Sequence, residues 1–257
     1  MIKHWLALHW QMAEAETLVR SGVRKIVGDV TFEMPGDCLN ADGLTFEDIG
    51  YSEKGKFNQL KRNYWNQESA DKAIEKLLSR KDSAHASASI RMQAGDKDSR
   101  SSGYCMQSLT ITIAGERSFL DFHYRSTEIS MKFLADLLFF CKILPPVFER
   151  LGIKPELIRF KFANAFISAL YQPIFLRFEE DPLGFYKHLK KTDPKFYRTY
   201  LMASSKFFAD SHNYTYRMRV KMFTYTKEFV PQWKVDKLLP LVAGIKGDLP
   251  EDEEDEE

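Results

Sequence analysis

Residues 105–136 read CMQSLTITIAGERSFLDFHYRSTEISMKFLAD, and this stretch decides the fold class. Two runs within it, 109–113 and 120–124, alternate apolar and polar residues, and Gly115 lies between them. This pattern predicts two consecutive strands joined by a turn. After Glu128 the apolar residues return at helical spacing, which predicts a helix. The stretch therefore combines strand and helix within about one supersecondary unit.

The same two patterns recur on both sides of this stretch. Helical spacing predicts helices over 4–22 and over 69–83, the second capped by Ser69. The predicted strands cover 25–36, interrupted at Gly28, then 87–93, and the first part of 157–175. Helices and strands are interspersed without an internal repeat, so we expect the α+β class and one domain over 1–247.

Composition indicates where in the cell the protein is found and which cysteine chemistry it can use. With 257 residues, 44% of them hydrophobic, the chain can bury a sizeable core. No apolar run approaches the roughly 20 residues that cross a bilayer, and the N-terminus lacks a signal-peptide pattern, so we expect a cytoplasmic protein. The cysteines are too few and too scattered for a disulfide framework or a zinc site: Cys38, Cys105 and Cys141. We expect reduced thiols and no metal ion.

The net charge of +1 hides an acidic end. Residues 251–257 are all Asp or Glu, and without these seven the chain carries 37 basic and 29 acidic residues. We expect 248–257 to be a solvated acidic tail; a second interpretation is a mimic of nucleic acid that shields a basic face. Residues 186–227 mix Lys and Arg with Phe and Tyr. That mixture is typical of a nucleic-acid surface, or of buried aromatic side chains with solvated cations.

The block from Cys105 to Asp136 resembles the thymidylate synthases and the related phage deoxycytidylate (dCMP) hydroxymethylases. In that family a nucleophilic cysteine opens a strand, and an Arg-Ser pair that holds the nucleotide phosphate closes the next one. Here Arg125 and Ser126 follow Cys105 at the family's spacing. Weaker similarity extends over about residues 17–172.

The resemblance implies a mixed sheet with flanking helices that dimerises through a sheet face. The alternating strands would supply that apolar face, so we expect a homodimer. It also implies 5,10-methylenetetrahydrofolate as cofactor and a pyrimidine deoxynucleotide as substrate. The implied reaction is C5 hydroxymethylation or methylation, for modified phage DNA, in the host cytoplasm if the chain is phage-encoded.

The implied chemistry needs a thiolate beside a cation. Cys105 would add to C6 of the pyrimidine and make C5 nucleophilic. A thiol is mostly protonated at neutral pH, so we expect Arg125 to lower the pKa of Cys105 as well as to bind the phosphate with Ser126.

One position indicates which base is bound. Asp136 stands where the uracil-binding synthases have Asn, and a protonated acid can donate to N3 of cytosine and accept from its amino group. The dCMP hydroxymethylases make the same substitution, so Asp136 indicates cytosine. The resemblance adds Glu128 and Asn164 as further substrate-binding residues, with Glu47 or Glu53 as candidates for the family's catalytic glutamate.

Other family positions carry different residues here. Ala84 and His85 replace the two arginines that reach the partner's phosphate, and Phe166 and Ser168 replace the ribose-binding His and Tyr. A second hypothesis therefore stays open. The chain could be a catalytically degenerate relative that binds nucleic acid or protein through 186–227, since a shared fold does not fix function.

Overall fold

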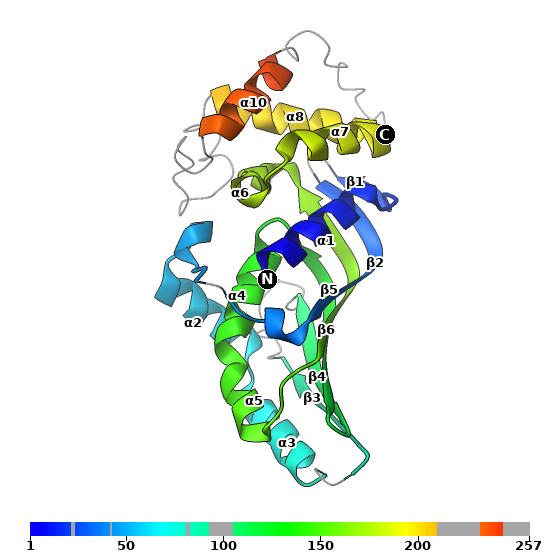
Figure 1. Cartoon of the computed structure of the whole chain (residues 1–257), viewed down its shortest axis with the longest axis vertical. Helices are drawn as coiled ribbons and strands as arrows, with labels where there is room; N and C mark the ends of the chain where they lie inside the picture. Colours follow the sequence, from blue (N-terminus) through cyan, green and yellow to red (C-terminus); the bar gives the residue numbers. More distant parts are fainter. Residues whose placement is uncertain (22–23, 42, 81–82, 93–104, 210–231, 244–257) are drawn as a thin grey trace, which may run out of the picture.

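The computed structural model describes residues 1–21, 24–41, 43–80, 83–92, 105–209 and 232–243. They include a six-stranded sheet in the order β1-β2-β6-β5-β4-β3 (Figure 1). Its strands are β1 Val19–Ser21, β2 Arg24–Pro35, β3 His85–Arg91, β4 Met106–Ala114, β5 Arg117–Glu128 and β6 Leu157–Ser168. Neighbouring strands are antiparallel except β5 and β6, which are parallel, so the predicted mixed sheet is confirmed.

Helices flank this sheet, and a second group of helices gathers at one end of the molecule (Figure 1). The helices beside the sheet are α1 Ile2–Glu14, α2 Glu53–Tyr64, α3 Gln67–Leu78, α4 Lys132–Ile143 and α5 Pro145–Leu151. The end group comprises α6 Gln172–Phe178, α7 Pro182–Thr192, α8 Pro194–Ala209 and α10 Gln232–Ala243. Short 3-10 turns complete the order: η1 Gly36–Cys38, η2 Glu47–Ile49 and η3 Ala169–Tyr171. The α+β class is confirmed, and none of the described helices is long and apolar enough to cross a membrane.

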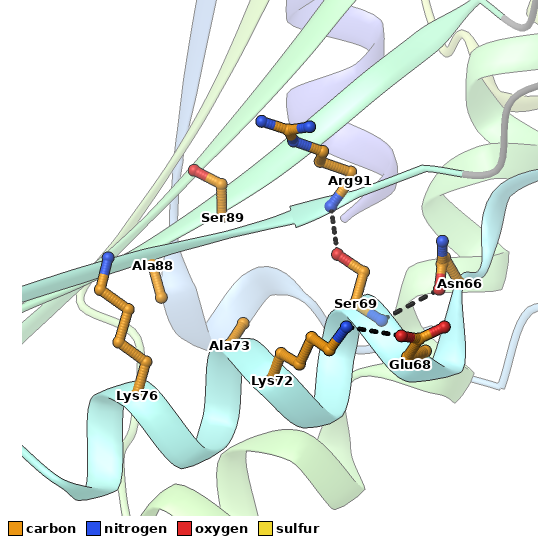
Figure 2. Close-up of a pocket in the computed structure, with 9 residues that line it drawn as sticks. All are labelled: Asn66, Glu68, Ser69, Lys72, Ala73, Lys76, Ala88, Ser89 and Arg91. Atoms are coloured by element: carbon orange, nitrogen blue, oxygen red, sulfur yellow. Dashed lines mark hydrogen bonds and ion pairs between the residues drawn. The ribbon is translucent and has the colours of Figure 1, made fainter.

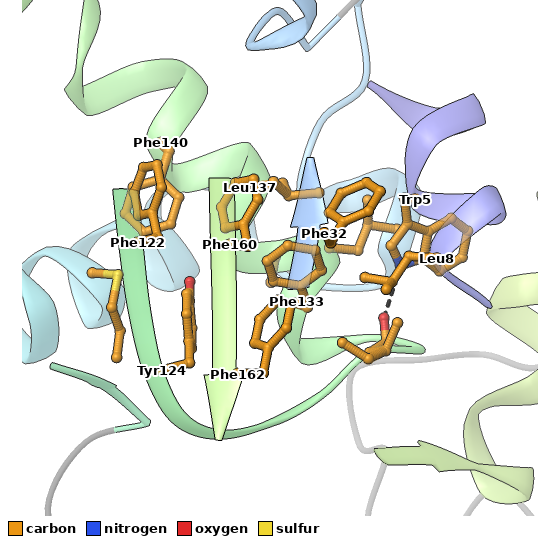
Figure 3. Close-up of a cluster of buried hydrophobic side chains, with 14 of the residues drawn as sticks. Trp5, Leu8, Phe32, Phe122, Tyr124, Phe133, Leu137, Phe140, Phe160 and Phe162 are labelled. Atoms are coloured by element: carbon orange, nitrogen blue, oxygen red, sulfur yellow. Dashed lines mark hydrogen bonds between the residues drawn. The ribbon is translucent and has the colours of Figure 1, made fainter. Parts of the chain in front are cut away.

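Helix α4 lies against one face of the sheet through a cluster of aromatic rings (Figure 3). The rings of Phe122 and Phe160, from the parallel strands β5 and β6, stack with centroids 4.7 Å apart. Phe140 of α4 packs on Phe122 at 4.5 Å, and Phe133 meets Phe160 edge to face at 5.0 Å. Such offset and edge-to-face contacts add to the burial of apolar surface, so they fix α4 on the sheet.

This packing corrects the expectation of an exposed apolar sheet face. Leu109 and Ile111 of β4, like Leu120 and Phe122 of β5, are fully buried inside the chain. The period-two alternation was interpreted correctly as strand, but its apolar side faces the chain's own helices. That face is therefore not available to a second copy.

The opposite face of the sheet is polar. The hydroxyls of Ser89 and Thr110 lie 2.9 Å apart across β3 and β4. On β5 and β6, Arg159 donates to Asp121 at 2.8 Å. An assembly through this face would join polar side chains rather than an apolar patch.

Three local expectations change in the structure. Strand β2 does not break at Gly28, which pairs with Asn164 of β6, and only Asp29 beside it has a positive φ of 48°. Helix α3 is capped by Asn66, whose side chain accepts from the N–H of Ser69 at 2.9 Å. The expected helix stop at Pro145 is real for α4, but that proline also opens α5.

A buried ion pair joins the N-terminal part of the chain to the second group of helices. Lys25 of β2 and Asp193, which precedes α8, have side chains only 2% and 3% exposed, and their charged atoms lie 3.4 Å apart. Lys25 also donates to the carbonyl of Ala13 at 2.9 Å, and Thr17 donates to Asp193 at 2.9 Å. Because these groups compensate one another, removing either charge would leave the other buried and unpaired.

Candidate functional site

The residues predicted to carry chemistry meet at one end of the sheet. Strands β3, β5 and β6 end there, and β4 begins there, because β4 runs against both of its neighbours. Cys105 directly precedes β4, and its carbonyl accepts from the N–H of Arg125 at 2.8 Å. The predicted nucleophile and the predicted phosphate ligand therefore lie side by side on neighbouring strands.

A bulge sets this alignment. Along most of the β4–β5 ladder, partners such as Leu109 and Phe122 follow one register, but the register shifts between Met106 and Ser108. Without the shift Cys105 would stand opposite Ser126 instead of Arg125. Bulges re-aim residues at strand ends, and this one places Cys105 opposite Arg125.

The predicted phosphate ligands form a polar row across β5 and β6. Ser126 stands opposite Asn164 in the parallel register, and both side chains are half-buried. Arg125 is exposed, on the side of the strand opposite to Tyr124, because successive residues of a strand point to opposite faces. By the same alternation Ser126 and Asn164 lie on the Tyr124 side, so Arg125 would reach a phosphate from the other side of the strand.

Asp136 lies on the other side, on the buried face of α4. Its side chain is 3% exposed and accepts from the Tyr124 hydroxyl at 3.3 Å. Burial raises the pKa of Asp136 to about 7, against the opposing effects of Lys56, the Tyr124 hydrogen bond and Lys132. Near neutral pH the acid is therefore partly protonated, which is the form that can donate to N3 of cytosine.

Cys105 differs from the expectation. Burial raises the pKa of its thiol, and the charge of Asp136 adds to that increase, while Lys132 and Arg125 oppose it. Arg125 thus acts in the predicted direction, but its effect is smaller than that of desolvation. The expected net lowering of the thiol pKa is wrong because the side chain is half-buried.

Glu128 also has a different role from the predicted one. Its carboxylate accepts from the backbone N–H groups of Ser130 at 2.7 Å, Met131 at 2.8 Å and Lys132 at 3.2 Å. Both of its oxygens are occupied by these three N–H groups, so it caps the start of α4 instead of binding a substrate. Burial raises the pKa of Glu128, whereas these hydrogen bonds lower it. Glu128 therefore positions the helix that carries Asp136.

Three residues at the site were not predicted from the sequence. Tyr124 donates a hydrogen bond to Asp136. Lys132 lies one helical turn before Asp136, and this spacing places Lys132 and Asp136 on one face of α4. Lys56 of α2 has its ammonium 4.2 Å from the centre of the Tyr51 ring. Burial lowers the pKa of Lys56, and Asp136 opposes that shift. Nothing in the local sequence around Lys56 indicates this contact.

The remaining predicted positions take structural roles. Glu53 accepts from the N–H of Phe46 at 2.8 Å and pairs with Lys142 at 2.6 Å, so it holds α2 rather than serving as a free catalytic acid. Glu47, the second candidate, is an exposed residue of η2. Ser168 is buried. The guanidinium of Arg24 lies over the Phe166 ring, 5.2 Å from its centre.

The basic aromatic stretch 186–227 is described only up to residue 209. Within that part, Tyr186 of α7 and Phe196 and Tyr200 of α8 are 0–1% exposed. Buried rings cannot stack on bases, so here the aromatic side chains belong to the core. Residues 210–227 and the acidic tail 248–257 lie outside the described residues.

A metal ion and a folate each need a specific set of side chains. Among them no group of three His, Cys, Asp or Glu side chains could hold a metal. The buried polar groups around Asp136 are already engaged, Tyr124 with Asp136, Tyr51 with Met131 at 3.3 Å, and Glu128 with the backbone of α4. The hydroxyls of Tyr124 and Tyr51 and the carboxylate of Glu128 are therefore not free to bind a pterin.

Comparisons with known proteins find similarity among solved structures. No family model matches the sequence, and no curated protein matches it. Among solved structures, the chain is similar to the thymidylate synthase from T4 phage, with 10% identity over 65% of this chain and 76% of that chain and a TM-score of 0.44. The likeness concerns the fold alone, and the activity of that enzyme is not carried over to this chain on its account.

Proposed function

We propose that this chain activates C5 of a cytosine nucleotide through a covalent adduct between Cys105 and C6 of the base. The observation that carries the proposal is the buried Asp136, whose pKa is raised to about 7 by burial and whose charge acts on the Cys105 thiol. A neutral acid beside a cysteine suits a base that offers one acceptor and one amino donor.

The proposed reaction has three steps. The Cys105 thiolate forms a bond to C6, and the electron pair of the C5–C6 double bond moves to C5, where the protonated Asp136 stabilises the base through N3. C5 then attacks a one-carbon electrophile. Loss of the C5 proton to a base restores the double bond and expels the thiolate.

Other side chains would position the nucleotide. Arg125 stands opposite Cys105 on the neighbouring strand and would bind the phosphate, while Ser126 and Asn164 would contact the nucleotide from the other side of β5. Methylenetetrahydrofolate remains the donor that the family resemblance implies, and no step here depends on how it would bind. C5 hydroxymethylation of dCMP for phage DNA is the specific form of this proposal.

A second candidate function has its own observation. The raised pKa of the Cys105 thiol, caused first by burial, is what a retained but inactive cysteine would show. Ala84 and His85 also leave Arg125 with fewer cationic partners than the family pattern has. The chain would then be a binding protein on an inherited scaffold.

Hydrogen exchange at C5 separates the two candidates without any one-carbon donor. Reversible attack at C6 lets the C5 hydrogen exchange with deuterated water, and mass spectrometry of dCMP and dUMP measures it. We expect exchange in dCMP that Cys105→Ser abolishes and the control Cys38→Ser retains. No exchange in the unmodified chain, with or without methylenetetrahydrofolate, would remove the enzymatic proposal.

The assembly proposal changes with the structure. A homodimer is still implied by the resemblance, but the apolar face is covered by α4, so the contact would use exposed polar side chains of the other face, such as Arg117 and Lys161. Such a dimer should dissociate as salt is raised, because salt screens exposed charges. Sedimentation across a salt series tests it, and a single-chain mass at low salt would refute it.

A further inference from the structure

Helix α7, in the group of helices at one end of the molecule, carries three lysines on one side (Figure 1). Lys187, Lys190 and Lys191 are all exposed, and spacings of three and four residues place them on the same side of a helix. The buried side chains of α7, such as Phe185 and Leu189, lie on its other side. The three lysines therefore share one surface, which we call the lysine face.

Within the described part of the chain, no carboxylate neutralises the lysine face. None of its three ammonium groups forms an ion pair there, and that of Lys190 lies 5.9 Å from the centre of the Tyr197 ring in α8. The described contact between α7 and a carboxylate is that of His188 with Glu14, 3.5 Å apart. Like charges one turn apart on a helix repel one another, so an anion would stabilise the lysine face.

The helix dipole accounts for only part of this cluster. Lys190 and Lys191 lie in the last turn of α7, where cations interact favourably with the dipole. That effect falls off within the last turn, and Lys187 precedes it. Lys187 therefore extends the cluster beyond the region that the dipole stabilises.

The lysines of α3 give a contrast. Lys72 and Lys76 lie four residues apart and line a pocket between α3 and β3 (Figure 2). There Lys72 is paired with Glu68 at 2.5 Å, so an acid of the same helix already compensates one of the two charges. This pair is a suitable control for the lysine face of α7.

The chain itself carries a complementary anion. Residues 251–257 are seven consecutive acids. Helix α10 ends at Ala243 and packs against α7 and α8 (Figure 1). The seven residues 244–250 can span about 24 Å when extended, so the acids are tethered close to these helices. A short tether gives a millimolar effective concentration, at which several weak ion pairs can hold a contact.

The lysine face suits a run of carboxylates better than a single-stranded nucleic acid. Such nucleic acids bind to cations together with aromatic rings that stack on the bases. The rings of Tyr186, Phe196 and Tyr200, in α7 and α8, are only 0–1% exposed. A run of carboxylates needs cations alone, and cations are what this face presents.

We propose that the acids 251–257 bind the lysine face of the same chain and compete there with external polyanions. The contact would join exposed, flexible groups, so it is screened by salt and can open. It does not depend on the chemistry proposed for Cys105. The exposed cations of α7 would then be available to an external polyanion only when it displaces these acids.

Zero-length coupling with a carbodiimide tests this contact in the full chain, because the reagent joins a carboxylate to an amine only where the two touch. Mass spectrometry of the digested chain then locates each bond. At low salt we expect at least about fivefold more bonds from 251–257 to the lysine face than to Lys72 and Lys76, because the tether favours the nearer site. In about 1 M salt, where the Debye length is about 3 Å, this excess should disappear.

Two variants separate a specific site from general attraction. Lys187→Gln/Lys190→Gln/Lys191→Gln should lower the total coupling of the acids severalfold, because other lysines do not replace the lost site. The matched control Lys72→Gln/Lys76→Gln should leave the coupling unchanged. Thermal unfolding checks that both variants are folded.

Truncation after Pro250 gives a second readout. It should raise the rate at which the lysine face is acetylated about two- to threefold, because an amine without a neighbouring carboxylate loses its proton more readily. Equal coupling to the lysines of α3 and α7, unchanged coupling in the triple variant, or bonds found only between chains would overturn the proposal. An oligonucleotide that protects the lysine face from acetylation without lowering the coupling would also overturn it, since the face would then bind nucleic acid instead.

Discussion

Asp136 makes the stability of the chain depend on pH in a way that one substitution can isolate. Burial raises its pKa from 3.8 to about 7. Between those values the folded chain retains a proton that the unfolded chain has released, so stability present below the lower value is lost as pH rises through about 7. At about 1.4 kcal/mol per pH unit, ionised Asp136 costs the folded state about 4 kcal/mol.

Asp136→Asn removes this dependence while it keeps an oxygen that can accept from Tyr124. The free energy of unfolding of the variant minus that of the unmodified chain should therefore rise by about 4 kcal/mol between about pH 4 and about pH 8. Burial lowers the pKa of His9 to about 3, so His9 destabilises the chain in acid. This effect is the same in the variant and in the unmodified chain, so it cancels in the difference. Only a group changed by the substitution contributes to the difference.

Urea unfolding followed by circular dichroism at several pH values measures this quantity. Glu149→Gln, which changes an exposed carboxylate of α5, is the matched control and should give a difference that varies little with pH. A pH-independent difference for Asp136→Asn would refute the reasoning. It would mean that the carboxylate is hydrated or paired and cannot remain neutral to donate to cytosine.

Three further predictions follow from other features. Lys25→Met should lower the free energy of unfolding by about 3–5 kcal/mol, because it removes the cation that lies 3.4 Å from the buried carboxylate of Asp193. Urea unfolding measures this, and a loss equal to that of the exposed control Lys195→Met would contradict it. The rate of C5 exchange should rise with pH as the Cys105 thiolate forms and fall above about pH 7, because ionised Asp136 no longer donates to N3 and its charge raises the pKa of the thiol. Asp136→Asn should remove the fall and shift preference towards dUMP, and an unchanged pH–rate profile or base preference would oppose this. Truncation after Pro250 should raise affinity for single-stranded DNA severalfold at low salt, because seven acids no longer compete with phosphates, and equal anisotropy curves for both forms would refute it.

Most of the sheet could be predicted from local patterns. Strands β4 and β5 follow from period-two alternation, and Gly115, with a φ of 61°, supplies the turn that joins them. The break expected at Gly28 failed because pairing with β6 carries the strand through a residue that local propensity disfavours. The partner of the apolar face could not be predicted either, since alternation gives a buried side but does not say what covers it.

Part of the site could also be predicted from the sequence, and part could not. The spacing of Cys105 and Arg125 across one hairpin is a local property, although the bulge that aligns them is not visible in the sequence. The net rise of the thiol pKa depends on desolvation, and the approach of Lys56 to Asp136 depends on how α2 packs. Both are tertiary effects that no spacing rule contains.

The most direct test of the central claim is to locate the covalent bond. A cytosine nucleotide with fluorine at C5, supplied together with methylenetetrahydrofolate, can accept the thiolate at C6 and the one-carbon unit at C5 but then has no C5 proton to lose, so the adduct should persist. Proteolysis and mass spectrometry of the treated chain should find the nucleotide on the peptide that carries Cys105, with none on Cys38 or Cys141. An unmodified Cys105 peptide, under conditions in which the nucleotide is bound, would contradict the account.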